Sequence, residues 1–200
     1  MKRLTTISII IICLVCSIYG QETNTTICTN KAIEKVNSRG VKIGLKIDEV
    51  LNLFDLTEEE KQRILNNANA SSKVAFGSKG FVVYPKLNDE KFDGISGYSF
   101  GFLDDRLVSF NVGYSKPKWK DANQFGSKII KFFDLPKIEN WESNAGSLNI
   151  QCENHYIRLY ASNSSSSFSI SDTRVRIILE EREQKILEEK REKEIKAFKP

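Results

Sequence analysis

The chain has 200 residues, of which 40% are hydrophobic and 28% are charged, an ordinary composition for a soluble protein with one or two cored domains. Its 30 basic residues only slightly outnumber its 26 acidic ones. Nucleic-acid binding requires a clustered basic face, so this balance argues against a nucleic-acid partner.

The first twenty residues differ from all that follow. Lys2 and Arg3 supply a positive start, and an unbroken apolar run of about a dozen residues begins at Ile9. This run is shorter than the roughly 20 residues with which a helix spans a bilayer. We therefore expect residues 1–20 to be a signal peptide cleaved after Gly20. The mature chain would be periplasmic or secreted, would have no transmembrane helix, and would be nearly neutral.

Two alternatives to cleavage stay open, an uncleaved anchor and a lipid anchor on Cys13 or Cys16. A lipid-acceptor cysteine normally follows a small residue, whereas Cys16 follows Val15.

The remaining chain alternates between helical and strand periodicity after a polar lead at 21–29, which we expect to be flexible. Helical spacing predicts helices over 30–38, 47–54, 57–66, 121–134 and 172–200. Alternating spacing predicts strands over 73–76, 81–84, 97–103, 108–114, 147–153, 156–162 and 167–171, with a turn at 77–80.

Two local patterns give the clearest predictions of secondary structure. Thr57 and Glu60 form a capping box, in which each side chain accepts from the other residue's free backbone N–H. The turn at 104–106 joins two strands with one aromatic-rich face each. These faces hold Tyr98, Phe100 and Phe102 on the first strand and Val108, Phe110, Val112 and Tyr114 on the second.

The order of elements predicts an α+β domain over 30–171, with an antiparallel sheet and helices packed on one face. The segments 48–56 and 127–135 resemble each other as helix ends, which suggests two half-domains, 39–115 and 119–171. A long charged C-terminal helix would follow at 172–200.

Cys28 and Cys152 are the two cysteines of the expected mature chain. An oxidising compartment makes a disulfide between them plausible, and it would close a loop of more than a hundred residues. The alternative is a small buried Cys152 and a free Cys28.

The C-terminal helix carries acid-before-base pairs four residues apart, which stabilise an exposed helix. It is either a solvated helix or a partner-binding arm. The arm would use its sparse apolar side chains, Ile186, Leu187, Ile195 and Phe198.

The residues give little support for catalysis. The sole histidine, His155, falls in a predicted turn, and no serine stands in a nucleophile-elbow pattern. The carboxylates Asp104, Asp105 and Glu153 are the only candidates for a hydrolase, and adjacent acids at a hairpin tip are typical turn residues. We expect no enzyme activity, no metal and no cofactor.

One stretch carries a family resemblance. In 39–54, RGVKIGLKIDEVLNLF, Gly44, Glu49, Val50 and Leu53 match the segment typical of BamE/OmlA-type outer-membrane assembly lipoproteins and of β-lactamase-inhibitory-protein-like domains. Lys46 stands where those families have a capping serine or threonine. Taken whole, the chain resembles secreted proteins of environmental bacteria, a likeness that implies no function.

We therefore expect an exported, non-catalytic protein that binds another protein or an envelope component. A secreted enzyme inhibitor is the alternative, and a carboxylate-dependent hydrolase is the third. The sequence does not predict an oligomeric state.

Overall fold

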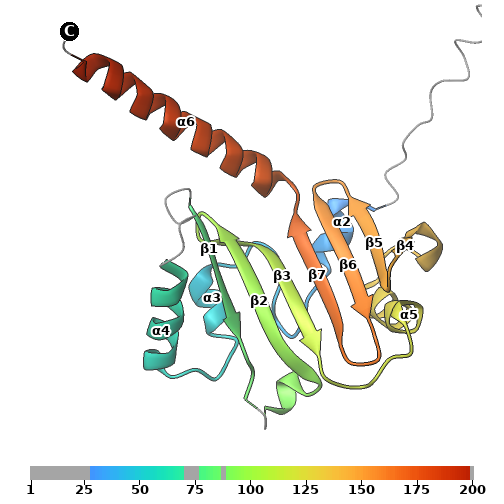
Figure 1. Cartoon of the computed structure of the whole chain (residues 1–200). Helices are drawn as coiled ribbons and strands as arrows, with labels where there is room; N and C mark the ends of the chain where they lie inside the picture. Colours follow the sequence, from blue (N-terminus) through green and yellow to red (C-terminus); the bar gives the residue numbers. More distant parts are fainter. Residues whose placement is uncertain (1–27, 70–76, 87–88, 199–200) are drawn as a thin grey trace, which may run out of the picture.

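The structure is a computed structural model that describes residues 28–69, 77–86 and 89–198. The expected signal peptide, most of the lead at 21–29 and the predicted strand at 73–76 lie outside the described residues. The described chain has the predicted α+β class, with one antiparallel sheet, several helices and a long C-terminal helix (Figure 1).

The sheet has seven strands in the order β1-β2-β3-β7-β6-β5-β4, and every neighbouring pair is antiparallel. Their bounds are β1 Ser78–Val83, β2 Ile95–Leu103, β3 Arg106–Tyr114, β4 Glu142–Asn144, β5 Ser147–Cys152, β6 His155–Ala161 and β7 Ser166–Asp172. The last strand of the chain, β7, thus lies in the middle of the sheet, between β3 and β6.

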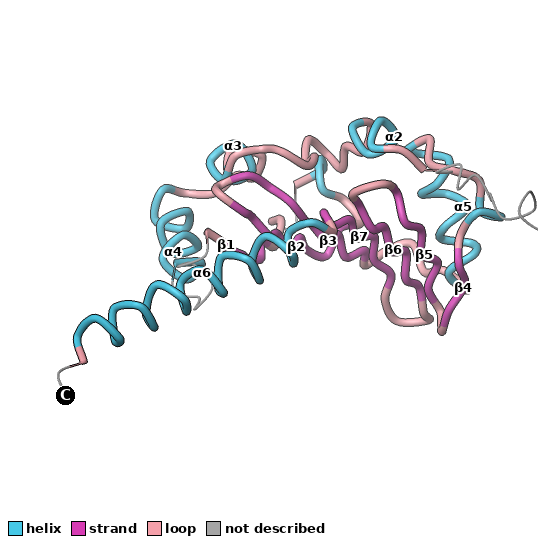
Figure 2. Tube along the Cα trace, turned by 90° about the horizontal axis from the view of Figure 1, so that it is seen from above, coloured by secondary structure: helices cyan, strands magenta, loops and turns pink. Residues whose placement is uncertain are grey.

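The helices are α2 Asn30–Glu34, α3 Ile47–Leu51, α4 Glu58–Asn69, α5 Ala122–Phe133 and α6 Arg174–Ala197, with short 3-10 turns at Glu90–Phe92 and Ile138–Asn140. Figure 2 shows α2, α3 and α5 on one side of the sheet. Helix α4 packs against the edge strand β1, and α6 leaves the end of β7 and runs away from the body (Figure 1). Of the described helices, only α6 extends toward the other side of the sheet (Figure 2).

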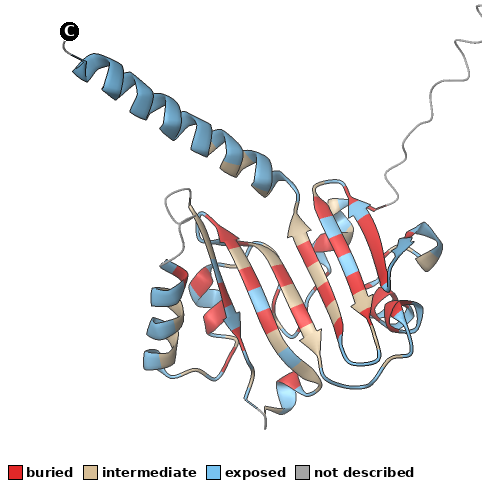
Figure 3. Cartoon of the chain, viewed as in Figure 1, coloured by how far each residue is buried: buried red, intermediate tan, exposed pale blue. Residues whose placement is uncertain are grey.

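Burial alternates along most of the strands, as a sheet with one covered face requires, except that β4 is exposed throughout and β5 is buried at every residue but Gln151 (Figure 3). The covered face of β1–β3 is aromatic. Phe100 is 3% exposed, and its ring lies 5.4–6.4 Å from four other rings. These rings belong to Phe54, Phe81, Tyr98 and Phe102. The covered face of β5 and β6 is instead aliphatic, with Leu148, Ile150, Ile157 and Leu159.

The stretch before α3 is tied to the start of β3. The N–H of Gly44 donates to the carbonyl of Leu107, and the N–H of Leu107 donates to that of Leu45, both at 2.8 Å. Gly44 has a φ of +91°, and a Cβ there would meet nothing within 4 Å. A glycine is therefore needed for its left-handed backbone rather than for close packing.

The predicted capping box, which depends only on neighbouring residues, is confirmed. In the predicted capping box, Thr57 N–H donates to Glu60 Oε2 at 2.7 Å, and Glu60 N–H donates to Thr57 Oγ1 at 3.2 Å. Besides the earlier ends of helices α2 and α3, at Glu34 and Leu51, three details of the sheet differ from prediction. Strand β1 already begins at Ser78, inside the predicted turn, and the short strand β4 was not predicted.

The third difference is a register shift in the predicted hairpin. Phe102 pairs with Leu107 while Gly101 pairs with Ser109, so Val108 is an extra residue. The bulge places Leu107, rather than Val108, in the core with no exposed surface.

Candidate functional site

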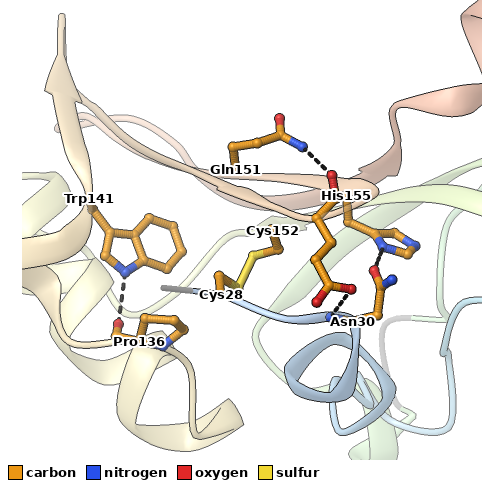
Figure 4. Close-up of a disulfide and its surroundings, with 8 residues drawn as sticks. Cys28, Asn30, Pro136, Trp141, Gln151, Cys152 and His155 are labelled. Atoms are coloured by element: carbon orange, nitrogen blue, oxygen red, sulfur yellow. Dashed lines mark hydrogen bonds between the residues drawn. A yellow bond between two sulfur atoms is a disulfide. The ribbon is translucent and has the colours of Figure 1, made fainter. Parts of the chain in front are cut away.

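The predicted disulfide forms between Cys28 and Cys152, whose Cα atoms are 4.4 Å apart (Figure 4). It joins the start of the described chain to the end of β5 across 124 residues. Cys28 is only 1% exposed. Cys28, which falls in the predicted lead, is therefore part of the buried core.

His155 lies beside this bond and is 7% exposed, so it is a core residue (Figure 4). Its Nδ1 is 3.0 Å from Asn30 Oδ1, while its buried Nε2 has no partner among the described residues. Burial lowers the pKa of His155, and the nearby Asp172 partly opposes that shift. The imidazole thus fastens α2 to β6, and nothing near it forms a nucleophile-base pair.

The three candidate carboxylates do not form a catalytic group. Asp104 accepts two hydrogen bonds from Arg182 of α6, at 2.8 and 2.7 Å, and Asp105 accepts one from Lys79 at 3.0 Å. Both line an open polar cavity of about 590 Å³. Glu153 lies at the β5–β6 turn, which strand β7 separates from the β2–β3 turn that holds the two aspartates. Its carboxylate accepts a hydrogen bond from the N–H of Asn30.

The electrostatics of these groups point the same way. The hydrogen bonds from Arg182 hold the pKa of Asp104 below its ordinary value. A general acid needs the opposite shift. The cavity beside the β2–β3 turn therefore has an ion-paired wall rather than a poised proton donor.

The apolar side chains predicted for a partner-binding arm are all exposed on α6. They are Ile186 at 45%, Leu187 at 59%, Ile195 at 64% and Phe198 at 76%. The helix is held to the body by the Arg182–Asp104 ion pair, and most of the helix beyond Arg182 is exposed. Ile186 and Leu187 are adjacent, but seven charged residues, 188–194, separate them from Ile195 and Phe198, so the four form no continuous surface.

A larger surface emerges on the uncovered side of the sheet, which we call the open face (Figure 3). Its side chains alternate with the buried ones along each strand. On the three adjacent strands β2, β3 and β7 it presents nine positions, which we call the floor. They are Gly97, Ser99, Gly101, Ser109, Asn111, Gly113, Ser167, Ser169 and Ser171.

Cross-strand pairing arranges the floor in three rows. Ser99 pairs with Asn111, which pairs with Ser169. The other rows are Gly97–Gly113–Ser167 and Gly101–Ser109–Ser171. All nine side chains are small and none is charged, although charged residues make up 28% of the chain. The middle of the open face is therefore low, neutral and polar.

Larger side chains flank the floor on both sides, and we call them the walls. On β6, Tyr156, Arg158 and Tyr160 pair with Ser171, Ser169 and Ser167. On the other side stand Val82 and Tyr84, which are 45% and 73% exposed. The ring of Tyr84 lies over Gly97, where an added Cβ would come within 3.0 Å of Cδ1. The floor and walls together form a shallow trough with tyrosines on both sides.

The sequence carries a signal for this trough in the spacing of its small residues. The serines at 167, 169 and 171 alternate with Phe168 and Ile170, and Gly97, Ser99 and Gly101 alternate with three aromatic residues. The exposed positions are thus uniformly small. Their assembly into rows depends on β7 pairing with β3, which no local pattern predicts.

Other kinds of site find no support in the part of the chain that the structure describes. Within it, no helix has both the length and the apolar character to cross a membrane. Nor do three or more histidine, cysteine, aspartate or glutamate residues gather there as a set of metal ligands. Comparison with known proteins finds no matching family model, no matching curated protein and no matching solved structure.

Proposed function

We propose that this is a non-catalytic binding protein that recognises another protein through its open face. The observation that carries the proposal is the trough: an uncharged floor of glycine, serine and asparagine between walls that hold Tyr84, Tyr156 and Tyr160. A sheet face without function would normally carry long charged side chains or β-branched residues.

The chemistry of the trough matches protein recognition. Interface centres are depleted of charge and enriched in tyrosine, and a tyrosine loses little conformational entropy on binding. Serine, glycine and asparagine supply hydrogen bonds that adapt to a partner. Arg158, in the β6 wall, adds one residue type that is common at interface hot spots.

The size of the open face is also suitable. The floor and walls span five strands, which are spaced by ~4.8 Å and are about six residues long at ~3.3 Å each, and so give roughly 500 Å² of flat area. One side of a standard interface buries about 800 Å². The open face with its walls therefore supplies most of one such side.

We further propose that the protein is exported. This rests on the n-region and apolar run at 1–20, and the disulfide is what an oxidising compartment favours. The partner is then an envelope or extracellular protein. A secreted enzyme inhibitor is the second candidate, because a floor lower than its walls accepts a convex rim of an enzyme. The relation to BamE/OmlA-type and inhibitory-protein-like domains remains a proposal resting on 39–54.

The test uses the chain in the form that its host processes and exports, and mass spectrometry identifies its amino terminus. This protein is immobilised and used to capture binding proteins. Envelope and culture-medium extracts are passed over immobilised wild type and over the floor variants Ser99→Arg and Ser169→Arg. We expect a specific partner to be retained by the wild type and lost from both variants. An arginine there fills the floor without entering the core.

Two matched controls locate the binding surface. Ser127→Arg makes the same change on an exposed position of α5, on the covered side, and should retain the partner. A variant with Ile186, Leu187, Ile195 and Phe198 changed to serine tests the arm. A partner lost only from this arm variant would move the site to α6 and overturn the open face as the binding surface.

A further inference from the structure

A second, separate cavity lies on the covered side, where α5 meets the turn that precedes α3. Its volume is about 180 Å³. It is lined by Ile95, Tyr114, Ile129 and Phe133, with Ser38, Arg39, Asp93 and Phe132 completing the wall. A cavity of about 150 Å³ holds one benzene ring, so this one is the size of a single ring or branched apolar group.

Arg39 stands at this cavity in an unusual backbone conformation. Ser38 and Val41 exchange two backbone hydrogen bonds, at 2.9 and 3.0 Å, and Arg39 and Gly40 turn between them with φ of +59° and +101°. Such a turn favours asparagine, aspartate or glycine at its first position. Arginine there is held in a left-handed conformation that a long side chain rarely adopts, a feature that recurs at ligand sites.

The positive charge of Arg39 takes part in no ion pair that stabilises the described fold. Its side chain is exposed and makes no hydrogen bond or ion pair with any other described residue. Asp93, the acid that lines the same cavity, is already paired with Lys116 at 2.8 Å. That pair lowers the pKa of Asp93, and Arg39 contributes only a small further effect. The guanidinium of Arg39 therefore places at the rim of the cavity a positive charge that is not paired with any other described residue.

An aromatic ring stands at the same rim. Phe132 is 74% exposed, although its neighbour Phe133 is buried and the two rings make an edge contact at 4.9 Å. The four residues Ile95, Tyr114, Ile129 and Phe133 and the exposed ring thus offer apolar contact on several sides. A ligand that enters would cover Phe132 as well as fill the cavity.

We propose that this cavity binds a carboxylate that carries one ring-sized apolar group. The apolar group would fill the cavity and cover Phe132, and the carboxylate would pair with the Arg39 guanidinium, which is suited to planar anions. Two sources share this chemistry, a free aromatic acid and the carboxyl-terminal residue of a peptide ending in phenylalanine or leucine. The site is separate from the open face and does not depend on its role.

The primary experiment is an NMR titration of the full chain with 3-phenylpropanoate, with the neutral 3-phenylpropanamide as the matched probe. We expect millimolar binding of the acid, as is usual for a ligand of this size, with shifts centred on the amides around Arg39 and Phe132. The amide should bind about tenfold more weakly, because it lacks the charge that pairs with Arg39. Absence of binding by the acid, or shifts centred elsewhere, would overturn the proposal.

Arg39→Asn is the decisive variant, since asparagine suits the left-handed turn and the fold should be kept. It should bind the acid and the amide equally and weakly. Lys185→Asn removes one positive charge from α6 and should bind as the wild type does. Equal affinity of the acid for wild type and Arg39→Asn would show that the charge has no role.

The two sources are separated by a second pair of probes. A short peptide ending in phenylalanine is compared with the same peptide amidated at its carboxyl end. A peptide that binds more tightly than 3-phenylpropanoate supports recognition of a chain terminus. A peptide that does not bind, while the free acid does, assigns the cavity to a small aromatic acid.

Discussion

The two halves of the sheet cover their inner faces with different chemistry. Strands β1–β3 bury a connected group of aromatic rings centred on Phe100. Strands β5 and β6 bury aliphatic side chains and add the Cys28–Cys152 bond. The amino-terminal half is thus stabilised by ring packing, and the carboxyl-terminal half by aliphatic packing and a covalent link.

This difference follows from how each half is closed. The 47–54 segment lies over β1–β3 and is connected to them by nearby chain, so packing of Phe54 against Phe92 and two sheet rings, Tyr98 and Phe100, holds it in place. The segment that begins at Cys28 reaches β5 from far away in the sequence, and its α2 is only five residues long. Helix α3 is equally short but carries the ring contacts of Phe54, whereas the segment at Cys28 is held by the disulfide.

The largest expected effect comes from removing the central ring. Phe100→Ala should lower the free energy of unfolding by about 3–5 kcal/mol, because it leaves a cavity among four rings. Urea unfolding followed by tryptophan fluorescence measures this change. Phe100→Leu keeps most of the volume and loses only the ring contacts, so it should cost about 1–2 kcal/mol. Equal losses for the two variants would show that the rings contribute nothing specific.

The disulfide is expected to rank second. Replacing Cys28 and Cys152 by alanine should lower the free energy of unfolding by about 2–5 kcal/mol, since a loop of this length gains much entropy when opened. Hydrogen exchange should rise in 28–36 and β5, while β1–β3 stay protected. Wild type treated with a reductant should match the double variant. If exchange rose equally in both halves, the covalent link would not be local to one of them.

A smaller effect concerns pH. Because burial lowers the pKa of His155 below its ordinary value of 6.5, the unfolded chain takes up a proton at a higher pH than the folded chain. The stability due to neutral His155 is complete above about pH 6.5 and decreases as pH falls from there toward the lowered pKa.

His155→Gln tests this dependence. It removes the titration while keeping a polar side chain beside Asn30. Urea midpoints between pH 5 and 7.5 should decline for wild type as pH falls and stay flatter for the variant. The lowered pKa of Asp172 places its own titration below this window. Parallel pH profiles for the two proteins would exclude His155 as the source.

The elements that sequence predicts well are those whose signals are local. The capping box at Thr57 needs only neighbouring atoms, and the 104–106 turn needs only two adjoining strands. Sheet order is different, because the pairing of β3 with β7 joins residues about sixty positions apart. The bulge at Val108 is likewise decided by which side chain the core accepts.

The candidate sites were less accessible to prediction for the same reason. The sequence around each residue of the central row, Ser99, Asn111 and Ser169, does not distinguish it from other polar residues. The three form one row only because β3 pairs with both β2 and β7. Arg39 is an ordinary charged residue in sequence. Only the turn between Ser38 and Val41 and the approach of α5 place it beside an apolar cavity.

The position of β7 also bears on how the chain comes together in time. β7 is the last strand synthesised and the one that joins β3 to β6. Until residue 172 is available, β1–β3 and β4–β6 are separate groups of strands, and β3 and β6 each lack the partner that β7 provides. A chain that is translocated before that point does not yet have its complete sheet. The floor of the open face forms only after all its strands have been synthesised.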